Sequence, residues 1–410
     1  MIRTLVAAVF AIALAACATA RTPADPPAIA VVLVSIDGFR PADLGRGLTP
    51  HLDALARDGV RAEYMRPSYP SLTFPNHYTL VTGLRPDRHG IVHNTMEDED
   101  LGDFALKLAP AVDDARWWGG EPIWATAEKA GIRSATMFWP GSSAEIGGVR
   151  PAEWRPYDGS YPGDARVDTV LGWLDRPAAS RPRLVTLYFE DVDHAEHDHG
   201  PGSREAEAAI STVDRYIGRL REGLAARGPG GHVDIVVVSD HGMAPVPPSQ
   251  VIAVEDIAPP EVAANVTAGQ SVGFRPEPGR EDEARRRLLG RHAHYECRTR
   301  ESLPAHWHYG RHPRVPPIVC QMDEGWDAVK RAWLPARRAG HTRGSHGYDP
   351  ALPSMRALFV ADGPSFRDGA VVPAFDNVDV YPLLARLLGV TAQPNDGDPA
   401  TGATMLRSQP

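Results

Sequence analysis

The stretch "AIAVVLVSID" at residues 28–37 decides the fold. Its apolar residues follow one another instead of alternating with polar ones, which indicates a strand buried on both faces. Three further runs share this character, at residues 183–193, 233–242 and 355–362. Strands of this kind are typical of a parallel sheet whose two faces are covered by helices.

The segments between these runs supply such helices. Residues 49–59 begin with a threonine cap and end at glycine, and residues 205–228 form a long amphipathic pattern that also stops at glycine. We therefore predict an α/β fold with a doubly wound, mainly parallel sheet.

One region interrupts the pattern. Residues 255–340 carry many prolines and arginines and only short strand-like pieces, and the α/β pattern resumes after them. We expect a small α+β cap subdomain inserted into a single catalytic domain, which consists of residues 29–254 and 341–410.

The N-terminus predicts export. Residues 1–20 combine an early arginine with an apolar run that is too short for a stable membrane span, as in a signal peptide. Residues 14–17 form a lipobox ending at Cys17, which would be lipidated, whereas residues 18–20 offer an ordinary cleavage site. We favour the lipobox because cysteine is scarce in this chain. Residues 21–28 would be a linker, and the protein a periplasmic, outer-membrane lipoprotein.

The two remaining cysteines, Cys297 and Cys320, both fall in the predicted cap. A cysteine pair in an exported protein indicates one disulfide bond, and two free buried thiols are the alternative.

The charge balance bears on partners. The formal net charge is −9 and no long basic run occurs, which argues against a nucleic-acid polymer as partner. A small anionic substrate remains compatible, because a bound metal supplies positive charge locally. No protein partner is inferred.

Acidic residues end three of the four apolar runs. Asp37, Asp193 and Asp240 stand there, with His197 and His241 within four residues of an acid. Open α/β sheets place ligand sites at the carboxyl ends of their strands, and like charges crowded there repel unless a cation joins them. Ligation by aspartate and histidine without cysteine suits zinc and other divalent transition metals.

A late segment, "TRGSHGYDP", adds His346 between Gly344 and Gly347, which let the backbone approach a crowded site. Six ligands suit two metals with three protein ligands each, which leaves positions open for substrate.

The segment "SLTFPNH" at residues 71–77 carries a candidate nucleophile. Thr73 is expected at the N-cap of a helix, with Pro75 in its first turn. Free N–H groups at a helix start favour an anionic phosphoryl oxygen. Thr73 is thus either an ordinary cap or a nucleophile, and the six metal-type residues favour the nucleophile.

These residues, in this order, resemble the nucleotide pyrophosphatase/phosphodiesterase family of the alkaline phosphatase superfamily, and the lipobox suggests a bacterial member. The resemblance rests on the blocks "SIDGFRPADL", "YPSLTFPNHYTLVTGLRPDRHGIVHN", "YFEDVDHAEHDHGP", "VVVSDHGM" and "GSHGYDP". It implies two Zn²⁺ per chain, with Thr73 as nucleophile and bridging ligand. One zinc would be bound by Asp193, His197 and His346, and the other by Asp37, Asp240 and His241.

The resemblance also implies substrate contacts. Asn94 matches an amide that binds a phosphate oxygen. Phe74 and Tyr188 resemble a pair that stacks a nucleobase, and Tyr157 is a weaker candidate for the pocket wall. Glu196 stands where family members often have glycine, which bears on the local geometry beside His197.

The function expected from these residues is an exported two-zinc phosphodiesterase that releases nucleoside 5′-monophosphate through a phosphothreonine intermediate. A choline or lipid phosphodiesterase would use the same metal core. A phosphomonoesterase would be expected to carry a cationic anchor in place of Asn94, and a sulfatase would need a C-x-P-x-R motif that this sequence lacks. A nucleotide-binding pseudoenzyme disagrees with the complete ligand set.

Overall fold

The computed structural model describes residues 29–227 and 233–408. The predicted signal peptide, Cys17 and the linker lie outside these residues. Across the two described ranges, no helix is both long and apolar enough to cross a membrane.

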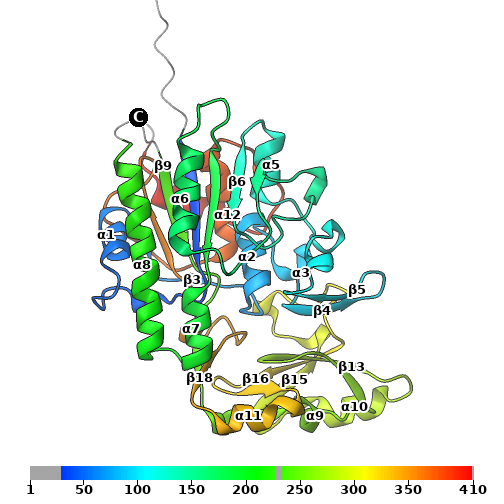
Figure 1. Ribbon diagram of the computed structural model, residues 1–410. Coiled ribbons are helices and arrows are strands. Elements are labelled where there is room, and N and C mark those ends of the chain that lie inside the picture. The colour runs from blue at the N-terminus through cyan, green and yellow to red at the C-terminus, as the bar shows by residue number, and fades with distance from the viewer. Residues whose placement is uncertain (1–28, 228–232, 409–410) are drawn as a thin grey trace, which may run out of the picture.

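An eight-stranded sheet forms the centre of the molecule (Figure 1). In spatial order its strands are β20 (Ala370–Val372), β2 (Val60–Ala62), β19 (Phe359–Asp362), β9 (Val233–Val238), β1 (Ala30–Ile36), β8 (Leu184–Phe189), β6 (Ser134–Met137) and β7 (Glu153–Trp154). Most neighbours are parallel, which confirms the predicted fold class.

Strand β19 departs from the parallel arrangement. It runs antiparallel to both β9 and β2. Its first residue, Phe359, pairs with Val238 at the carboxyl end of β9. The chain therefore re-enters the sheet at that edge after the cap, so β19 must run in the opposite direction.

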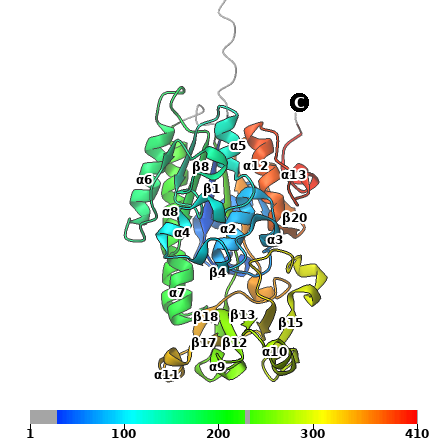
Figure 2. The same cartoon turned by 90° about the vertical axis from the view of Figure 1, so that its right-hand side faces the viewer.

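Helices cover both faces of the sheet (Figures 1 and 2). Successive strand residues point to opposite faces, so Val32 and Val34 of β1 join one core cluster, and Val31 and Leu33 join the other. The first cluster includes side chains of α1 (Pro50–Asp58), α6 (Gly163–Leu174) and α8 (Arg204–Ala225). The second includes side chains of α2 (Thr73–Thr82), α5 (Ile123–Lys129) and α12 (Val380–Leu388).

A separate sheet lies beyond the carboxyl ends of the central strands, at the bottom of Figure 1. It is antiparallel and consists of β12 (Ala263–Thr267), β13 (Ser271–Pro276), β16 (Ile318–Met322), β15 (Tyr295–Thr299) and β14 (Gly290–Arg291). It has its own apolar core, to which α10 (Glu281–Leu288) and α9 (Val254–Ile257) contribute. Cys297 and Cys320 face each other on β15 and β16 and form a disulfide bond. These elements lie inside or next to residues 255–340, whose limits as a subdomain stay a prediction.

Short strands and helices complete the described structure. The two-stranded sheets described are β10 (Ala244–Val246) with β18 (Arg343–Ser345), β11 (Val251–Ala253) with β17 (Asp327–Val329), β3 (Met65–Arg66) with β21 (Phe375–Asp376), and β4 (Thr95–Asp98) with β5 (Gly102–Ala105). The remaining α-helices described are α3 (Pro86–His89), α4 (Ala109–Val112), α7 (Asp191–His199), α11 (Leu334–Ala339) and α13 (Pro399–Met405).

Candidate active site

Three neighbouring strands end beside one another and bring acidic residues together. Strand β1 lies between β9 and β8, and all three run parallel. Asp37 follows β1, Asp240 follows β9, and Asp193 lies in the first turn of α7 after β8. All three side chains are buried. The strand ends thus place three carboxylates inside the protein at the same edge of the sheet.

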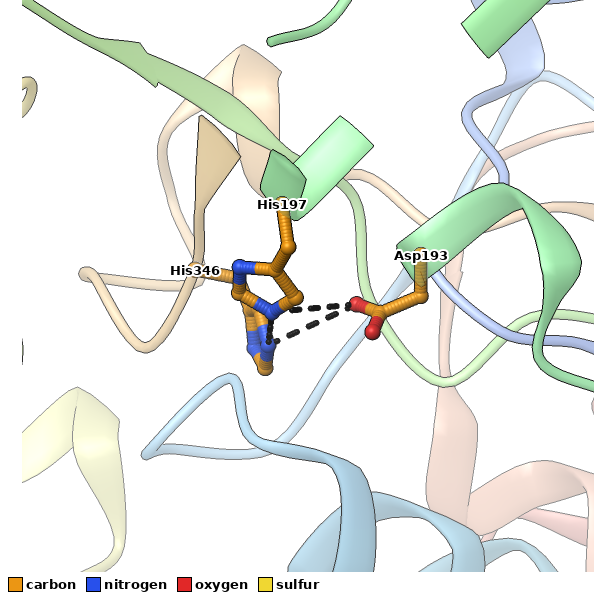
Figure 3. Close-up of side chains that lie close together, drawn as sticks. All are labelled: Asp193, His197 and His346. Carbon is orange, nitrogen blue, oxygen red and sulfur yellow. Dashed lines mark hydrogen bonds and ion pairs between the residues drawn. The ribbon is translucent and has the colours of Figure 1, made fainter. Parts of the chain in front are cut away.

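Asp193, His197 and His346 form the first group of candidate ligands (Figure 3). One ligand atom from each lies within 4.8 Å of the others. The Oδ1 atom of Asp193 is 3.4 Å from His197 Nε2 and 3.6 Å from His346 Nε2, and the two Nε2 atoms are 3.0 Å apart. His197 stands one turn after Asp193 on α7, and His346 directly follows β18.

The second group lies next to the first. His241 Nε2 is 2.9 Å from Asp240 Oδ2 and 3.6 Å from Asp37 Oδ1. Asp37 and His241 also form a group of candidate ligands with Asp193. Asp193 therefore adjoins both groups, as expected of a centre that holds two metal ions about 4 Å apart.

The hydrogen bonds of the three imidazoles test whether these residues fit a metal. In each, Nδ1 lies 2.9–3.0 Å from a backbone carbonyl, of Gly344 for His197, of Ser71 for His346 and of Gly242 for His241. A carbonyl only accepts, so Nδ1 carries the proton and Nε2 keeps a lone pair directed at the carboxylates.

Each carboxylate of the two ligand groups has one buried oxygen without a hydrogen-bond partner among the described residues: Asp37 Oδ1, Asp193 Oδ1 and Asp240 Oδ2. Lone pairs of imidazole and carboxylate cannot satisfy one another, whereas a divalent cation would satisfy them all. The donor set therefore fits a metal centre.

The pKa values describe the same pocket. Burial, followed by the charges of Asp240 and Asp193, raises the pKa of Asp37 well above its usual value. Burial also opposes ionisation of Asp240, but its interactions with the imidazoles of His241 and His77 outweigh burial and hold the pKa of Asp240 well below its usual value. Burial lowers the pKa of His346, as do the neighbouring His241 and His197. A neutral His346 is the form that ligates a metal.

Thr73 begins helix α2, and the predicted N-cap role is wrong. Leu72 occupies the N-cap, where the backbone is extended with φ −121° and ψ 154°. Helical geometry thus starts one residue earlier than the cap pattern suggests. The hydroxyl oxygen of Thr73 lies 3.3 Å from His241 Nε2, so it faces the second ligand group.

Asn94 lies beside the start of the same helix. Its Oδ1 atom accepts a hydrogen bond of 3.0 Å from the backbone N–H of Phe74, the residue after Thr73. The structure thus places the candidate nucleophile and the candidate phosphate anchor next to each other.

His77 joins the site although the sequence pattern does not single it out. Its Nδ1 is 2.9 Å from the carbonyl oxygen of Thr73 and 3.3 Å from Asp240 Oδ2, and its Nε2 is 2.8 Å from Ser35 Oγ. His77 could be grouped with Asp37 and Asp240 as a ligand. Both of its ring nitrogens are already engaged, however, so His241 is the better ligand and His77 supports Asp240. The spacing of four residues from Thr73, one helical turn, is the signal that could have found it.

The three candidate aromatic residues differ in their surroundings. Tyr188 donates its hydroxyl to Asp37 Oδ2 at 2.7 Å and meets His77 edge to face. Tyr157 is 55% exposed and lies against Tyr188. Phe74 is half-buried and packs against the rings of Phe104 and Trp118. Tyr188 is therefore tied to a candidate metal ligand, whereas Tyr157 is open to solvent.

Glu196 is fully buried behind the first ligand group. Its carboxylate has no hydrogen-bond partner among the described residues, although Arg40 lies 3.3 Å away. Burial raises its pKa to about 8, and the charge of Arg40 counters this rise. Glu196 therefore lies beneath the site and not at its rim.

A doubly wound α/β sheet with two adjoining Asp/His groups, and a helix-terminal hydroxyl facing one of them, defines a metal-binding hydrolase site. The sequence profile of one family, described as type I phosphodiesterase / nucleotide pyrophosphatase, matches residues 31–349. The chain belongs to this family, and its enzyme class is phosphoric diester hydrolase.

This chain covers different shares of the relatives that it resembles in sequence. An uncharacterized pyrophosphatase/phosphodiesterase of Schizosaccharomyces pombe is 38% identical over 92% of this chain and 80% of its own length. Ectonucleotide pyrophosphatase/phosphodiesterase family member 3 of Mus musculus is 37% identical over 93% of this chain, which spans only 45% of that protein.

Solved structures show the same fold. Murine ectonucleotide pyrophosphatase/phosphodiesterase 5 superposes with a TM-score of 0.87 at 34% identity, covering 92% of this chain and all of that chain. An inactive threonine-to-alanine variant of the murine protein, in complex with AMP, gives a TM-score of 0.86 at 33% identity, with the same coverage of both chains.

Proposed function

We propose that this chain is an exported two-zinc phosphodiesterase that cleaves nucleotide phosphodiester or pyrophosphate bonds and releases nucleoside 5′-monophosphate. The observation that carries the proposal is the Thr73 hydroxyl, held at a helix start 3.3 Å from His241 beside two adjoining ligand groups. The AMP complex of the murine relative supports a nucleotide ligand.

Each ligand group would hold one zinc ion. Asp193, His197 and His346 would bind the first, and Asp37, Asp240 and His241 would bind the second together with Thr73. Zinc, when bound, lowers the pKa of a coordinated hydroxyl and stabilises developing negative charge on oxygen. Elemental analysis should find two zinc ions per chain, and a chelator should abolish activity that added zinc restores. Full activity after complete removal of metal would contradict this assignment.

The protein groups would divide the reaction as follows. The Oγ1 atom of Thr73 forms a bond to phosphorus while the bond to the leaving oxygen breaks. The hydroxyl proton passes to solvent, and the leaving group departs as an alcohol or a phosphate whose oxygen takes up a proton from solvent. Water then cleaves the phosphothreonine ester, which frees Thr73 and the nucleoside 5′-monophosphate.

The Nδ2 amide of Asn94 and the backbone N–H of Thr73 would bind a non-bridging oxygen throughout, since the N–H of Phe74 is donated to Asn94 Oδ1. A neutral amide suits a diester, which carries one negative charge fewer than a monoester.

The base would be bound by the aromatic residues at the site. Tyr157, Tyr188 and Phe74 offer the ring surfaces. Stacking on such rings accepts any base, so we expect weak base preference.

A comparison of kcat/KM for three substrates tests the proposed function. A nitrophenyl nucleotide diester should be preferred over a simple phosphate monoester and a choline phosphodiester. Preference for the monoester would overturn the diesterase assignment, and preference for the choline ester would assign the enzyme to lipid-type substrates on the same ligand set.

We also propose a periplasmic location with a lipid on Cys17. The scarcity of cysteine and the lipobox at residues 14–17 support this. The Cys17→Ala variant should leave the membrane fraction and appear in the soluble fraction, as followed by immunoblotting. Retention of the variant in the membrane fraction would contradict lipid anchoring.

A further inference from the structure

One segment of the cap packs into the catalytic domain instead of its own sheet. Residues 304–315, named the cap arm here, belong to the connection from β15 to β16. The arm is yellow in Figure 1, where it approaches α3 and β4. Its side chains Trp307, Tyr309 and Val315 are buried in the core cluster on the α2 face of the central sheet. Trp307 stacks on Tyr69 with ring centroids 3.9 Å apart.

The arm is hydrogen-bonded to residues that precede Asn94 in the sequence. The carboxylate of Asp87, in α3, accepts backbone N–H groups from three consecutive arm residues, at 2.8–3.0 Å: Gly310, Arg311 and His312. The hydroxyl of Tyr309 donates to the carbonyl of Val92 at 3.0 Å. These bonds fix the turn that leads into Asn94.

Arg314 fastens both sides of Asn94 at once. Its Nη1 donates to the carbonyls of Gly90 at 2.9 Å and Trp117 at 2.7 Å, and its Nε donates to Asp98 Oδ2 at 2.7 Å. The guanidinium also lies over the ring of Trp117 at 4.6 Å. The side chain is only 8% exposed, so water and salt screen these contacts weakly.

We propose that the cap arm is a positioning device for Asn94, with Arg314 as its central residue. The inference rests on the proposed function, in which Asn94 binds a phosphate oxygen. Asn94 meets the catalytic helix through its bond to the Phe74 N–H, and its backbone lies between the arm contacts at Val92 and Asp98. The arm therefore sets the distance between the anchor and Thr73 without touching the substrate.

A double-mutant cycle tests this role. Arg314→Gln should lower kcat/KM for the nucleotide diester by about tenfold, the scale of a small misplacement of a binding group. The same substitution in an Asn94→Ala background should have no further effect. Hydrogen exchange of residues 86–98 should rise in Arg314→Gln, while that of residues 191–199 stays unchanged.

Two further variants complete the design. Tyr309→Phe removes one hydroxyl and should give a smaller loss that also vanishes without Asn94, which keeps the test valid if Arg314→Gln does not fold. Arg291→Gln breaks an exposed ion pair with Asp323 elsewhere in the cap and should change nothing.

Two results would overturn the inference. If Asn94→Ala is slow but the losses from Arg314→Gln and Asn94→Ala multiply, the arm does not act through Asn94 and only the arm's role fails. If Asn94→Ala has the wild-type rate, the anchor role in the proposed function fails as well.

Discussion

At the scale of single residues, Thr73 and the preceding residue, Leu72, have different roles. The residue that caps α2 is Leu72, so the hydroxyl of Thr73 is not needed to begin the helix. It points instead toward His241. Because the Thr73 hydroxyl does not cap the helix, its removal should change the free energy of unfolding little.

Thr73→Ala should therefore abolish turnover while leaving the protein folded. We expect kcat to fall by at least about 10³-fold, the scale of losing a nucleophile, with an unchanged melting temperature. Thr73→Ser is the matched control, because it keeps the hydroxyl and should retain part of the activity. Hydrolysis of the nucleotide diester at the wild-type rate by Thr73→Ala would show that another group attacks phosphorus.

At the scale of elements, helix α2 carries the candidate nucleophile Thr73 and also contacts the candidate metal ligand Asp240 through His77. Thr73 and His77 are one turn apart, and His77 contacts both the Thr73 carbonyl and the Asp240 carboxylate. Trp139 in turn donates its indole N–H to the carbonyl of His77 at 2.9 Å. The helix thus couples the position of Thr73 to that of Asp240.

His77→Ala should weaken metal binding without removing a ligand. We expect zinc affinity to fall by about 10- to 100-fold, as when a group that orients a metal ligand is lost. Competition with a chromophoric chelator measures the zinc affinity independently of catalytic activity. His194→Ala, on the exposed side of α7, should bind zinc like the wild type. An unchanged zinc affinity in His77→Ala would show that His77 does not orient a metal ligand.

Prediction from sequence works best where strand order decides the outcome. Asp37, Asp193 and Asp240 could be placed together because buried parallel strands end at a common edge. The start of α2 was predicted one residue late, since the cap propensity of Thr73 does not reveal where the extended chain before it ends. The direction of β19 depends on long-range packing that no local pattern records, whereas the spacing of His77 from Thr73 could have indicated its place but not its contact with Asp240.

At the scale of the whole molecule, the inserted cap contributes side chains both to its own apolar core and to a core of the catalytic domain. The cap sheet packs on its own apolar cluster, whereas the cap arm belongs to the core of the catalytic domain. The arm contacts could not be predicted, because they join segments far apart in sequence, such as Arg314 and Asp98, which are 216 residues apart. The disulfide bond joins β15 to β16 in the cap sheet and closes the loop that contains the arm.

Replacing Cys297 and Cys320 together by alanine should destabilise the cap and spare the chemistry. Closing a loop of this length, with a sequence separation of 23 residues, contributes about 3 kcal/mol in the chain-entropy account. Thermal unfolding should shift to lower temperature, while kcat at 25 °C stays near that of the wild type. Reduction of the wild-type protein should reproduce the shift. No shift in either experiment would support free thiols in place of the bond.

The backbone carbonyls that orient His197, His241 and His346 have an evolutionary consequence. Gly344, Gly242 and Ser71 make these bonds through main-chain atoms, which every amino acid possesses. Any side chain at Gly344 or Gly242 would nevertheless move the backbone, because an added Cβ would lie 2.5 Å from the carbonyl oxygen of Glu196 or 2.1 Å from that of Ser354. The tautomers of His197 and His241 are therefore supported by main-chain atoms whose positions depend on glycine.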